Sequence, residues 1–358
     1  MTIQKPIVVK FGGSDMKTSR DMRLIADIIK RYPTPLIVVV SALYGLTDRL
    51  AEVARSVKDD AALIDGLRRF LLSTKREIAE NFLDDPEKLA PVMAGVSSRL
   101  KELERYLKGI HFLGQTPEFA EDLILSYGER LSSRLLSSLL KAEGVDCEEA
   151  LPEDIGLITD GEFGNAGIDY GASRRRLKGR FSARKVYIVP GFYGVSPDGK
   201  VNLLGRGGSD YSAAAIARCA GAASLDIWKD VDGFMSADPK AVPDAVPVRR
   251  LSRREASELA YFGAKILHSR TMEPLAGTDI AIRIMNLHGR GSGRRPGSLI
   301  NDRRRVSRNV IKSIASTDRI GILRLDGPGL GARSGVMARA TAALDAAGIN
   351  ILSVITAQ

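Results

Sequence analysis

Two glycine-rich turns in this chain have the residue types needed to hold a phosphorylated anion. The first, Lys10-Phe11-Gly12-Gly13-Ser14, follows the apolar residues Ile7 to Val9. The second, Gly205-Arg206-Gly207-Gly208-Ser209-Asp210, follows an apolar run and opens an alanine-rich one. Glycines let the backbone approach a ligand, and the free N–H groups at a helix start favour negative charge. Because a cation stands beside each turn, the pair predicts one phosphorylated ligand held between two halves of a domain.

Each turn alone has a plainer interpretation, which is a tight connection from a strand to a helix. Ser209 or Asp210 would then be the N-cap of the helix. Neither turn matches a Gly-x-x-x-x-Gly-Lys-Ser/Thr P-loop or a Gly-x-Gly-x-x-Gly dinucleotide fingerprint, so both of those folds lose support. The three histidines, His111, His268 and His288, are scattered along the chain, which argues against a histidine metal site or a serine-histidine triad.

Length and composition indicate a globular protein with one large domain and a smaller one. The chain has 358 residues, is 44% hydrophobic and carries a net charge of +10, which favours anionic ligands without naming one. No signal peptide or apolar run near membrane-spanning length is present, so we expect a cytoplasmic protein. Cys147 and Cys219 have no metal-like spacing, and we expect them to be buried free thiols.

An arginine-rich stretch with Gly, Ser and Pro lies late in the chain. Its arginines are Arg290, Arg294, Arg295, Arg303, Arg304, Arg305 and Arg308. A nucleic-acid patch is one interpretation. No aromatic residue interleaves with these arginines, so the pattern favours a solvated connection between domains.

The N-terminal third predicts a β-α-β unit followed by a helical insertion. Residues 3–10 read as a strand, 20–31 as a helix and 36–41 as a strand buried on both faces. Ser41 stands at the carboxyl end of that second strand, where open α/β sheets bind ligands. Thr47 begins the next helical pattern, and a capping role is its plainer interpretation.

A leucine-rich helix begins, on this reading, at Tyr127-Gly128-Glu129. Glu129 would lie in its first turn, where the helix dipole already favours a carboxylate, so a ligand role for Glu129 stays open. Later elements follow from the same patterns. We expect strands at 186–192, 225–233, 280–286 and 298–300, a helix at 254–262, and a tail with strands at 320–325 and 349–355 around a helix at 336–347.

Taken in order, these pieces resemble the aspartate kinases, a branch of the amino-acid kinase family. The resemblance rests on motifs spread over residues 3 to 300. They are Val9 to Ser14, Val40-Ser41-Ala42 with Thr47, Gly128-Glu129, Gly205 to Asp210, Lys229 to Gly233 with Ala237-Asp238-Pro239, and Glu258 to His268. Three positions depart from the usual pattern, namely Lys229, Met235 and Ser269.

The resemblance implies a three-layer αβα amino-acid kinase fold with a mainly parallel sheet. The kinase domain would span residues 1–305, with the helical insertion at about 48–120. Residues 306–358 resemble the first half of an ACT domain, an amino-acid-sensing module, as a partial βαβ segment. Its unfinished sheet edge would be a liability unless another subunit or a further segment covers it, and we expect a homo-oligomer, a dimer, through this region.

The function implied is ATP-dependent phosphorylation of the β-carboxylate of L-aspartate with Mg²⁺, the first step towards lysine, threonine and methionine. Family knowledge gives catalytic roles to Lys10, Asp210 and Lys265, and aspartate binding to Ser41, Thr47, Glu129 and Arg206. It gives ATP binding to Lys10, Gly12, Gly13, Ser14, Gly207, Gly208, Ser209, Lys229, Asp230, Asp238, Lys240 and Lys265. No dedicated metal ligand, nucleic acid or membrane is implied.

The chemistry of this reaction agrees with the residue types. An aspartate carboxylate has a reference pKa of about 3.9, so the nucleophile is ionised at neutral pH and needs no general base. Cations are needed, because a carboxylate must approach a polyanion. Two other enzyme or sensor functions stay open, namely an amino-acid kinase with a different acyl acceptor and a catalytically silent amino-acid sensor.

Overall fold

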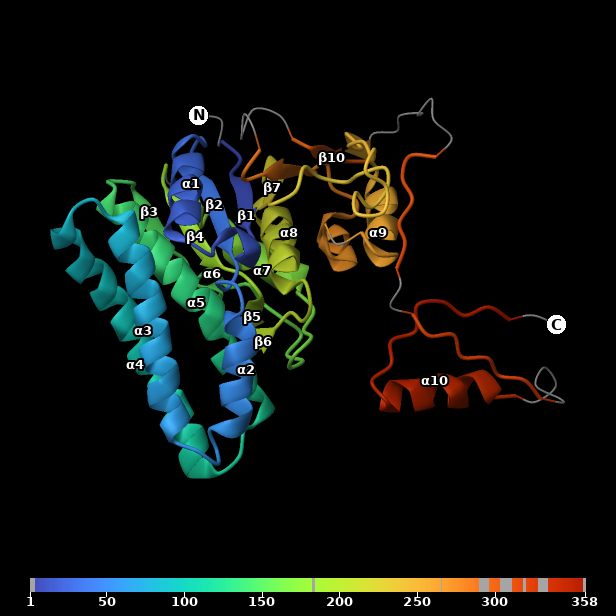
Figure 1. The fold of residues 1–358 in the computed structure, drawn as a ribbon, viewed down its shortest axis with the longest axis horizontal. Helices are drawn as coiled ribbons and strands as arrows, with labels where there is room; N and C mark the ends of the chain where they lie inside the picture. Colours follow the sequence, from blue (N-terminus) through green and yellow to red (C-terminus); the bar gives the residue numbers. More distant parts are fainter. Residues whose placement is uncertain are drawn as a thin grey trace. The chain divides into compact units, whose positions relative to one another are not determined.

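The structure is a computed structural model that describes residues 4–181, 184–264, 266–289, 296–302, 311–317, 320–327 and 334–356. It divides into two compact units, Met1–Ser316 and Thr317–Gln358, and each is described by itself (Figure 1). The arginine-rich stretch and the boundary predicted between residues 305 and 306 lie outside the described residues, so that boundary stays a prediction.

An eight-stranded sheet forms the centre of the larger unit, in the order β3-β4-β2-β1-β7-β9-β10-β8. The strands are β1 (Ile7–Phe11), β2 (Leu36–Val40), β3 (Cys147–Glu149), β4 (Val186–Pro190), β7 (Ser224–Lys229), β8 (Arg250–Leu251), β9 (Ala281–Asn286) and β10 (Ser298–Ile300). Every neighbouring pair is parallel except β9 with β10. The mainly parallel sheet predicted from the sequence is confirmed.

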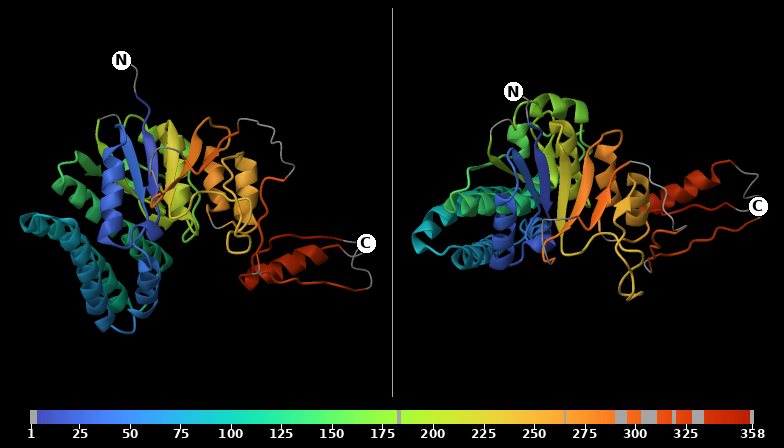
Figure 2. Two further views of the ribbon diagram at one scale, coloured as in Figure 1. Left: turned by 45° about the horizontal axis from the view of Figure 1, so that its top comes forward. Right: turned by 90° about the horizontal axis from the view of Figure 1, so that it is seen from above.

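Alternate residues of each strand face opposite helical layers, because successive side chains of a strand point to opposite faces. Val38 and Val40 belong to a core shared with α1 (Ser19–Lys30) and α5 (Glu118–Ala142). Ile37 and Val39 belong to a second core shared with α8 (Gly208–Ala220). The sheet is therefore buried on both faces, which explains why its central strands read as continuous apolar runs (Figure 2).

Helices dominate the chain between β2 and β3. They are α2 (Leu46–Ser56), α3 (Ala62–Phe82), the 3₁₀ helix η2 (Pro86–Lys88), α4 (Leu89–Leu113) and α5. Figure 1 shows α2, α3 and α4 extending beyond the sheet. Their apolar side chains join the core on the α1 face. This stretch is helical as the sequence predicts, and one end of it reaches the strand edge where the candidate site lies.

Shorter elements complete the larger unit. A two-stranded antiparallel sheet is made by β5 (Tyr193–Val195) and β6 (Val201–Leu203). The remaining helices are α6 (Pro152–Ile155), α7 (Tyr170–Leu177), α9 (Arg253–Tyr261) and the 3₁₀ helices η1 (Gly13–Asp15) and η3 (Ser269–Leu275). Cys147 and Cys219 are buried and free, as predicted.

The smaller unit contains the helix α10 (Val336–Ala346), close to the predicted 336–347. The strands predicted at 320–325 and 349–355 are wrong, because neither segment is a strand in the structure. A strand needs a neighbour to bond its N–H and C=O groups, and the described residues of this unit form no such ladder. The apolar pattern alone therefore misled, and Ile322 and Ile355 are 91% and 90% exposed.

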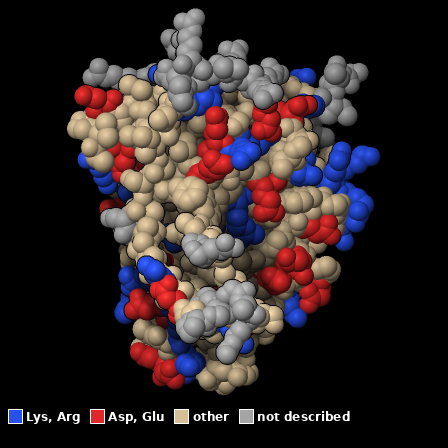
Figure 3. Space-filling model, turned by 90° about the vertical axis from the view of Figure 1, so that its right-hand side faces the viewer, with Lys and Arg blue, Asp and Glu red and all other residues tan. Residues whose placement is uncertain are grey.

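Surface chemistry adds two observations. No helix within the described ranges has both the length and the apolar character that crossing a membrane requires. On the face drawn in Figure 3, basic and acidic side chains are interspersed rather than separated by sign. The positive net charge is therefore not gathered into one continuous patch on the described part of this face.

Candidate active site

Four parallel strands bring their carboxyl ends together at one edge of the sheet. Phe11 at the end of β1 pairs with Val40 of β2 and Trp228 of β7, and Val40 pairs with Pro190 of β4. Because β1 lies between β2 and β7, the segments that follow these strands diverge to either side of β1. Open α/β sheets bind ligands at such a point. Residues that follow these strands are far apart in the sequence but adjacent here.

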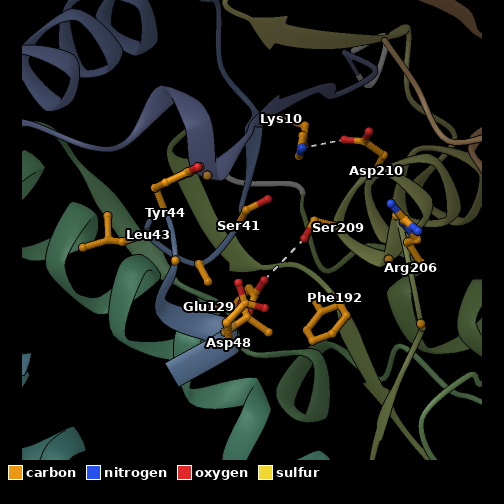
Figure 4. A pocket seen from close by; sticks show the side chains of 17 residues that line it. Lys10, Ser41, Leu43, Tyr44, Asp48, Glu129, Phe192, Arg206, Ser209 and Asp210 are labelled. Atoms are coloured by element: carbon orange, nitrogen blue, oxygen red, sulfur yellow. Dashed lines mark hydrogen bonds and ion pairs between the residues drawn. The ribbon is translucent and has the colours of Figure 1, made fainter. Parts of the chain in front are cut away.

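A cavity of about 330 Å³ opens at this edge (Figure 4). Its size falls within the usual range for small-molecule sites, roughly 300 to 1,000 Å³. The lining residues are Lys10, Gly13, Ser41, Ala42, Leu43, Tyr44, Gly45, Thr47, Asp48, Glu129, Phe192, Gly205, Arg206, Gly207, Gly208, Ser209 and Asp210. The two glycine turns and all four residues expected to bind aspartate thus line one space.

Lys10 and Lys229 both pair with the buried carboxylate of Asp210. The Nζ of Lys10 lies 2.5 Å from Oδ1 of Asp210, and the Nζ of Lys229 lies 3.4 Å from Oδ2. Burial alone would raise the pKa of Asp210, but the two lysine charges and their hydrogen bonds outweigh it and lower the pKa to about 2. Burial lowers the pKa of Lys10, and the charge of Asp210 opposes that shift. Two cations thus share one anion, which leaves positive charge for a ligand.

The second glycine turn places the start of α8 at the cavity. Gly207 is the N-cap, with φ at 76° and no side-chain cap. A Cβ on Gly207 would lie 2.4 Å from the Cβ of His268, so both the conformation and the packing require glycine. The prediction that Ser209 or Asp210 caps the helix is wrong, because Asp210 is held by Lys10 instead. The N–H of Gly208 is bonded to the carbonyl of Gly205. The next N–H groups of the first turn of α8, those of Ser209 and Asp210, therefore keep their capacity to bind an anion.

Thr47 is likewise not a cap. The helix α2 begins at Leu46 after Gly45, which is the N-cap at φ 74°. Thr47 lies in the first turn of α2 and lines the cavity, while Ser41 follows β2 as predicted and lines it too. Each hydroxyl is thereby available to a ligand.

Glu129 lies in the middle of α5 rather than in its first turn. The helix begins at Glu118 after Pro117, and the predicted start at Tyr127 is wrong. Gly128 does not break the helix; it allows α5 to approach the chain after β2, since a Cβ there would lie 2.8 Å from the Cβ of Ala42. The dipole at the start of a helix therefore does not account for a carboxyl group at this position.

Burial determines the electrostatics of Glu129. Its side chain accepts a hydrogen bond from the Oγ of Ser209 at 3.4 Å, drawn in Figure 4. Within the described part of the chain its Oε2 is buried without a hydrogen-bond partner. Burial raises the pKa of Glu129 to about 8, although the backbone of Ala42 and the hydroxyl of Ser209 act in the opposite direction. A buried, unsatisfied carboxyl oxygen in a cavity suits a cationic ligand group.

Arg206 supplies the opposite charge. It is exposed and lines the same cavity from the second glycine turn, and Figure 4 shows it on a different element from Glu129. Its planar guanidinium can bind a carboxylate through two parallel hydrogen bonds. The cavity thus offers a carboxyl group, an exposed arginine and the buried amine of Lys10.

Several residues expected at a nucleotide site are not among those that line the cavity. Gly12 and Ser14 flank the lining residue Gly13, and Lys229, which Asp230 follows in the chain, pairs with the lining residue Asp210. Asp238 and Lys240 lie in an exposed turn, where the N–H of Lys240 donates to Asp238 at 2.9 Å. Lys265 lies outside the described residues. The nucleotide roles of these residues stay predictions.

Three notable residues were not predicted. Asp15 is fully buried, accepts a hydrogen bond from the N–H of Gly12 at 2.9 Å, and has its pKa raised to about 6 by burial. Phe192 lines the cavity with φ at 73°, a strained conformation for a bulky residue. Lys75 of α3 is also fully buried, and burial lowers its pKa to about 7. Of the three, only Asp15 could have been recognised as a candidate from the sequence, because it directly follows the first glycine turn.

Comparison with known proteins places the chain in a family. The model of the amino acid kinase family matches residues 5–286. The chain belongs to this family. Among curated relatives, Aspartokinase 1, chloroplastic, of Arabidopsis thaliana is 30% identical over 356 residues, which covers 98% of this chain and 62% of the relative. Aspartokinase 2, chloroplastic, of the same plant is 30% identical and is covered to 64%. The chain therefore spans less than two thirds of the length of these relatives.

Solved structures of the same family share the fold. Aspartokinase III of E. coli in complex with aspartate and ADP (R-state) aligns with a TM-score of 0.72 at 28% identity, covering 84% of this chain and 65% of that one. The same enzyme in complex with lysine and aspartate (T-state) aligns with a TM-score of 0.78 at 25% identity, covering 98% and 77%. The three-layer architecture is thus that of the amino acid kinase family.

Proposed function

We propose that this protein is an aspartate kinase, which transfers the γ-phosphoryl group of ATP to the β-carboxylate of L-aspartate. One observation carries the proposal. A single cavity holds a buried carboxyl group with one oxygen that has no hydrogen-bond partner among the described residues, an exposed arginine, and a buried lysine beside a helix N-terminus. Aspartokinase III of E. coli, which binds aspartate and ADP in its solved structure, supports the choice of ligands.

Substrate recognition follows from opposite charges. Glu129 binds the α-ammonium group of aspartate through its unpartnered oxygen, and Arg206 binds a carboxylate. Ser41 and Thr47 offer hydroxyl groups on the wall of the same cavity. The free β-carboxylate then points towards the positive charge around Lys10. Because that carboxylate is already ionised, binding and orientation are the tasks left to the protein.

Phosphoryl transfer depends on cations and backbone N–H groups. Lys10 stabilises the negative charge of the transferring group, and Asp210 holds Lys10 in place through their ion pair. The N–H groups at the start of α8 bind phosphate oxygens. Lys229 and Lys265 are assigned to the nucleotide with Gly12, Gly13, Ser14, Gly207, Gly208, Ser209, Asp230, Asp238 and Lys240.

Mg²⁺ enters this proposal as part of the substrate Mg-ATP. No group of three or more potential metal-ligating side chains occurs among the described residues. Mg²⁺ usually keeps several waters and binds through substrate phosphates with one or two carboxylates, so a protein cage is not required. The ion would therefore arrive with the nucleotide.

The smaller unit is proposed to be the partial ACT-like segment and an oligomer contact. Its helix α10 has no buried residue, and Ile322 and Ile355 are almost fully exposed. Apolar side chains in this state favour association with a second copy. The division at 305, sensing of an end-product amino acid, and the cytoplasmic location belong to the same proposal.

The experiment that tests the function is an acyl-phosphate trap. The protein is incubated with Mg-ATP, hydroxylamine and either L-aspartate, L-glutamate or N-acetyl-L-glutamate, and the hydroxamate is measured. Formation with aspartate alone is the expected result. Formation with another acid would identify a different acyl acceptor. A folded protein that binds aspartate without forming hydroxamate would support a silent sensor instead.

A further inference from the structure

Arg270 makes a set of contacts that the proposed reaction does not use. From η3 its Nη1 donates to the carbonyl of Leu204 and to Oδ1 of Asn165, both at 2.7 Å, and its Nη2 donates to the carbonyl of Ala166 at 3.1 Å. Its guanidinium also lies over the ring of Tyr211, 4.4 Å from the centroid. One side chain thus joins three segments that are distant in the sequence.

Two of these segments lie side by side, and the one that contains Leu203 and Leu204 leads into the second glycine turn. The N–H of Ala166 donates to the carbonyl of Leu203 at 2.8 Å. At the other end, Asp122 accepts hydrogen bonds from the N–H groups of Gly164 at 2.9 Å and Leu203 at 2.8 Å. A carboxylate and a guanidinium therefore hold the same pair of segments from opposite ends, and charge-assisted hydrogen bonds are the stronger kind.

The glycine turn begins where Arg270 acts. Leu204, whose carbonyl it binds, directly precedes Gly205. Gly205 has φ at 70°, and a Cβ there would lie 2.4 Å from Oδ1 of Asn165, so the turn packs directly against a residue that Arg270 holds. The next residue, Arg206, is exposed, so its side chain is not held by a packed core. Its position therefore depends on the backbone of the glycine turn.

We propose that Arg270 is a positioning residue for the second glycine turn. It fixes the carbonyl before Gly205 and the side chain that packs on the turn, and so orients Arg206 and the first N–H groups of α8 towards the ligand. The kinetic part of this inference rests on the proposed aspartate kinase function, whereas the structural part does not.

The fork shape of arginine is essential to this role. One planar guanidinium donates hydrogen bonds to three acceptors and also lies over the ring of Tyr211. A lysine keeps the charge but offers a point-like ammonium that cannot make the same planar set. Arg270→Lys is therefore the informative conservative variant, and Arg270→Ala removes the group completely.

Arg218 of α8 is a matched control. Its Nη1 donates to two carbonyl groups, those of Pro274 at 2.7 Å and Ala276 at 3.1 Å, and its guanidinium lies over the ring of Tyr170 at 4.9 Å. It makes the same kinds of contact between α8 and the chain at η3, but the residues that it contacts do not adjoin the second glycine turn. Arg218→Ala should thus lower thermal stability without affecting the turn.

Hydrogen-deuterium exchange of the full chain without ligand tests the structural part. The amides of Leu204 and Gly208 are hydrogen-bonded to the carbonyl groups of Phe192 and Gly205 at 2.8 and 2.9 Å. In Arg270→Ala and Arg270→Lys we expect peptides covering 204–211 to exchange about tenfold faster, with no such change in Arg218→Ala. Unchanged exchange in both Arg270 variants, or the same increase in the control, would overturn the proposal.

Steady-state kinetics tests the functional part. We expect Arg270→Ala to raise the KM for aspartate about tenfold, with partial recovery in Arg270→Lys and no change in Arg218→Ala. If Arg270→Ala does not fold, the lysine variant alone decides, and wild-type exchange together with a wild-type KM in it would refute the role. A wild-type chain that does not phosphorylate aspartate would refute the proposed function, while the exchange comparison would still judge Arg270.

Discussion

Glu129 is a buried carboxyl group whose protonation state controls its ability to bind a cation. Its pKa of about 8 in the ligand-free protein means that it is mostly protonated at neutral pH. An ammonium group binds the ionised form, so aspartate binding must release a proton. We therefore expect aspartate affinity to increase with pH up to about 8, by at most about tenfold per pH unit, and then to level off.

Calorimetry in buffers of different ionisation enthalpy measures this proton release. The groups that act on Glu129 include Ser209 and Lys10, and Glu129 in turn acts on Lys75. Glu129→Gln is the control, because it should bind weakly with little dependence on pH in this range. An affinity for aspartate that is constant between pH 6.5 and 8.5 would show that Glu129 is already ionised in the free protein.

Lys10 and Arg206 should differ in the kinetic constant that they affect. Lys10→Ala removes a charge that acts on the transferring phosphoryl group, so we expect kcat to fall by at least about a hundredfold with little change in aspartate affinity. Arg206→Ala removes a ground-state contact and should mainly raise the KM for aspartate. Steady-state kinetics of both variants checks this. Reversed effects would mean that the two glycine turns serve the opposite ligands.

At the scale of elements, α3 carries a lysine that its position does not favour. Lys75 is fully buried and its Nζ has no hydrogen-bond partner within the described residues. Burial lowers its pKa to about 7. The negative charge of an ionised Glu129 would oppose this shift, but Glu129 is mostly protonated, and so uncharged, below pH 8. An uncompensated buried amine is destabilising, so we expect Lys75→Met to raise the free energy of unfolding by about 1–4 kcal/mol at pH 6.

The stabilisation expected from Lys75→Met depends on pH. The pKa of Lys75 is lower in the folded protein than in the unfolded chain, so between pH 7 and about 10.5 the unfolded chain binds more protons and stability rises with pH. The advantage of Lys75→Met should therefore shrink from pH 6 to pH 9 in urea titrations. Lys101→Met, at an exposed position of α4, should have little effect at either pH. A destabilised Lys75→Met variant would mean that the amine has a polar partner.

Most elements of the larger unit could be predicted because their patterns are local. The continuous apolar run of β2 and the leucine spacing of α5 each report burial directly. The start of α5 was wrong because a glycine inside a helix looks like a boundary, and only the fold shows that Gly128 makes room for Ala42. The predicted strands at 320–325 and 349–355 failed for a related reason, since an apolar run does not reveal whether a strand partner exists.

The candidate site was predictable in its polar residues but not in its supporting contacts. Lys10, Glu129 and Arg206 belong to motifs that can be read in the sequence, and the structure brings them to one cavity. The pairing of Asp210 with Lys10 joins residues that are 200 positions apart in the chain, so its use as an N-cap was the simpler inference. Arg270 and Lys75 lie outside any motif of obvious chemistry, and only packing reveals them.

At the scale of the whole molecule, the cavity belongs to the larger unit alone. Every lining residue lies between Lys10 and Asp210, and both apolar cores that support them lie within Met1–Ser316. The smaller unit has a helix without buried residues. Folding and ligand binding should therefore depend on the first unit, while association depends on the second.

Truncation after Ser316 separates these roles. We expect a chain of residues 1–316 to keep the thermal unfolding midpoint of its cavity-bearing unit and a KM for aspartate within about threefold of the full chain, because no lining residue is removed. We also expect it to be monomeric by light scattering under conditions where the full chain is a dimer, because the exposed apolar side chains of Thr317–Gln358 are gone. A monomeric full chain would refute the oligomer contact. A truncated chain that folds but loses aspartate binding would instead show that the second unit supports the site, contrary to the location of every residue that lines it.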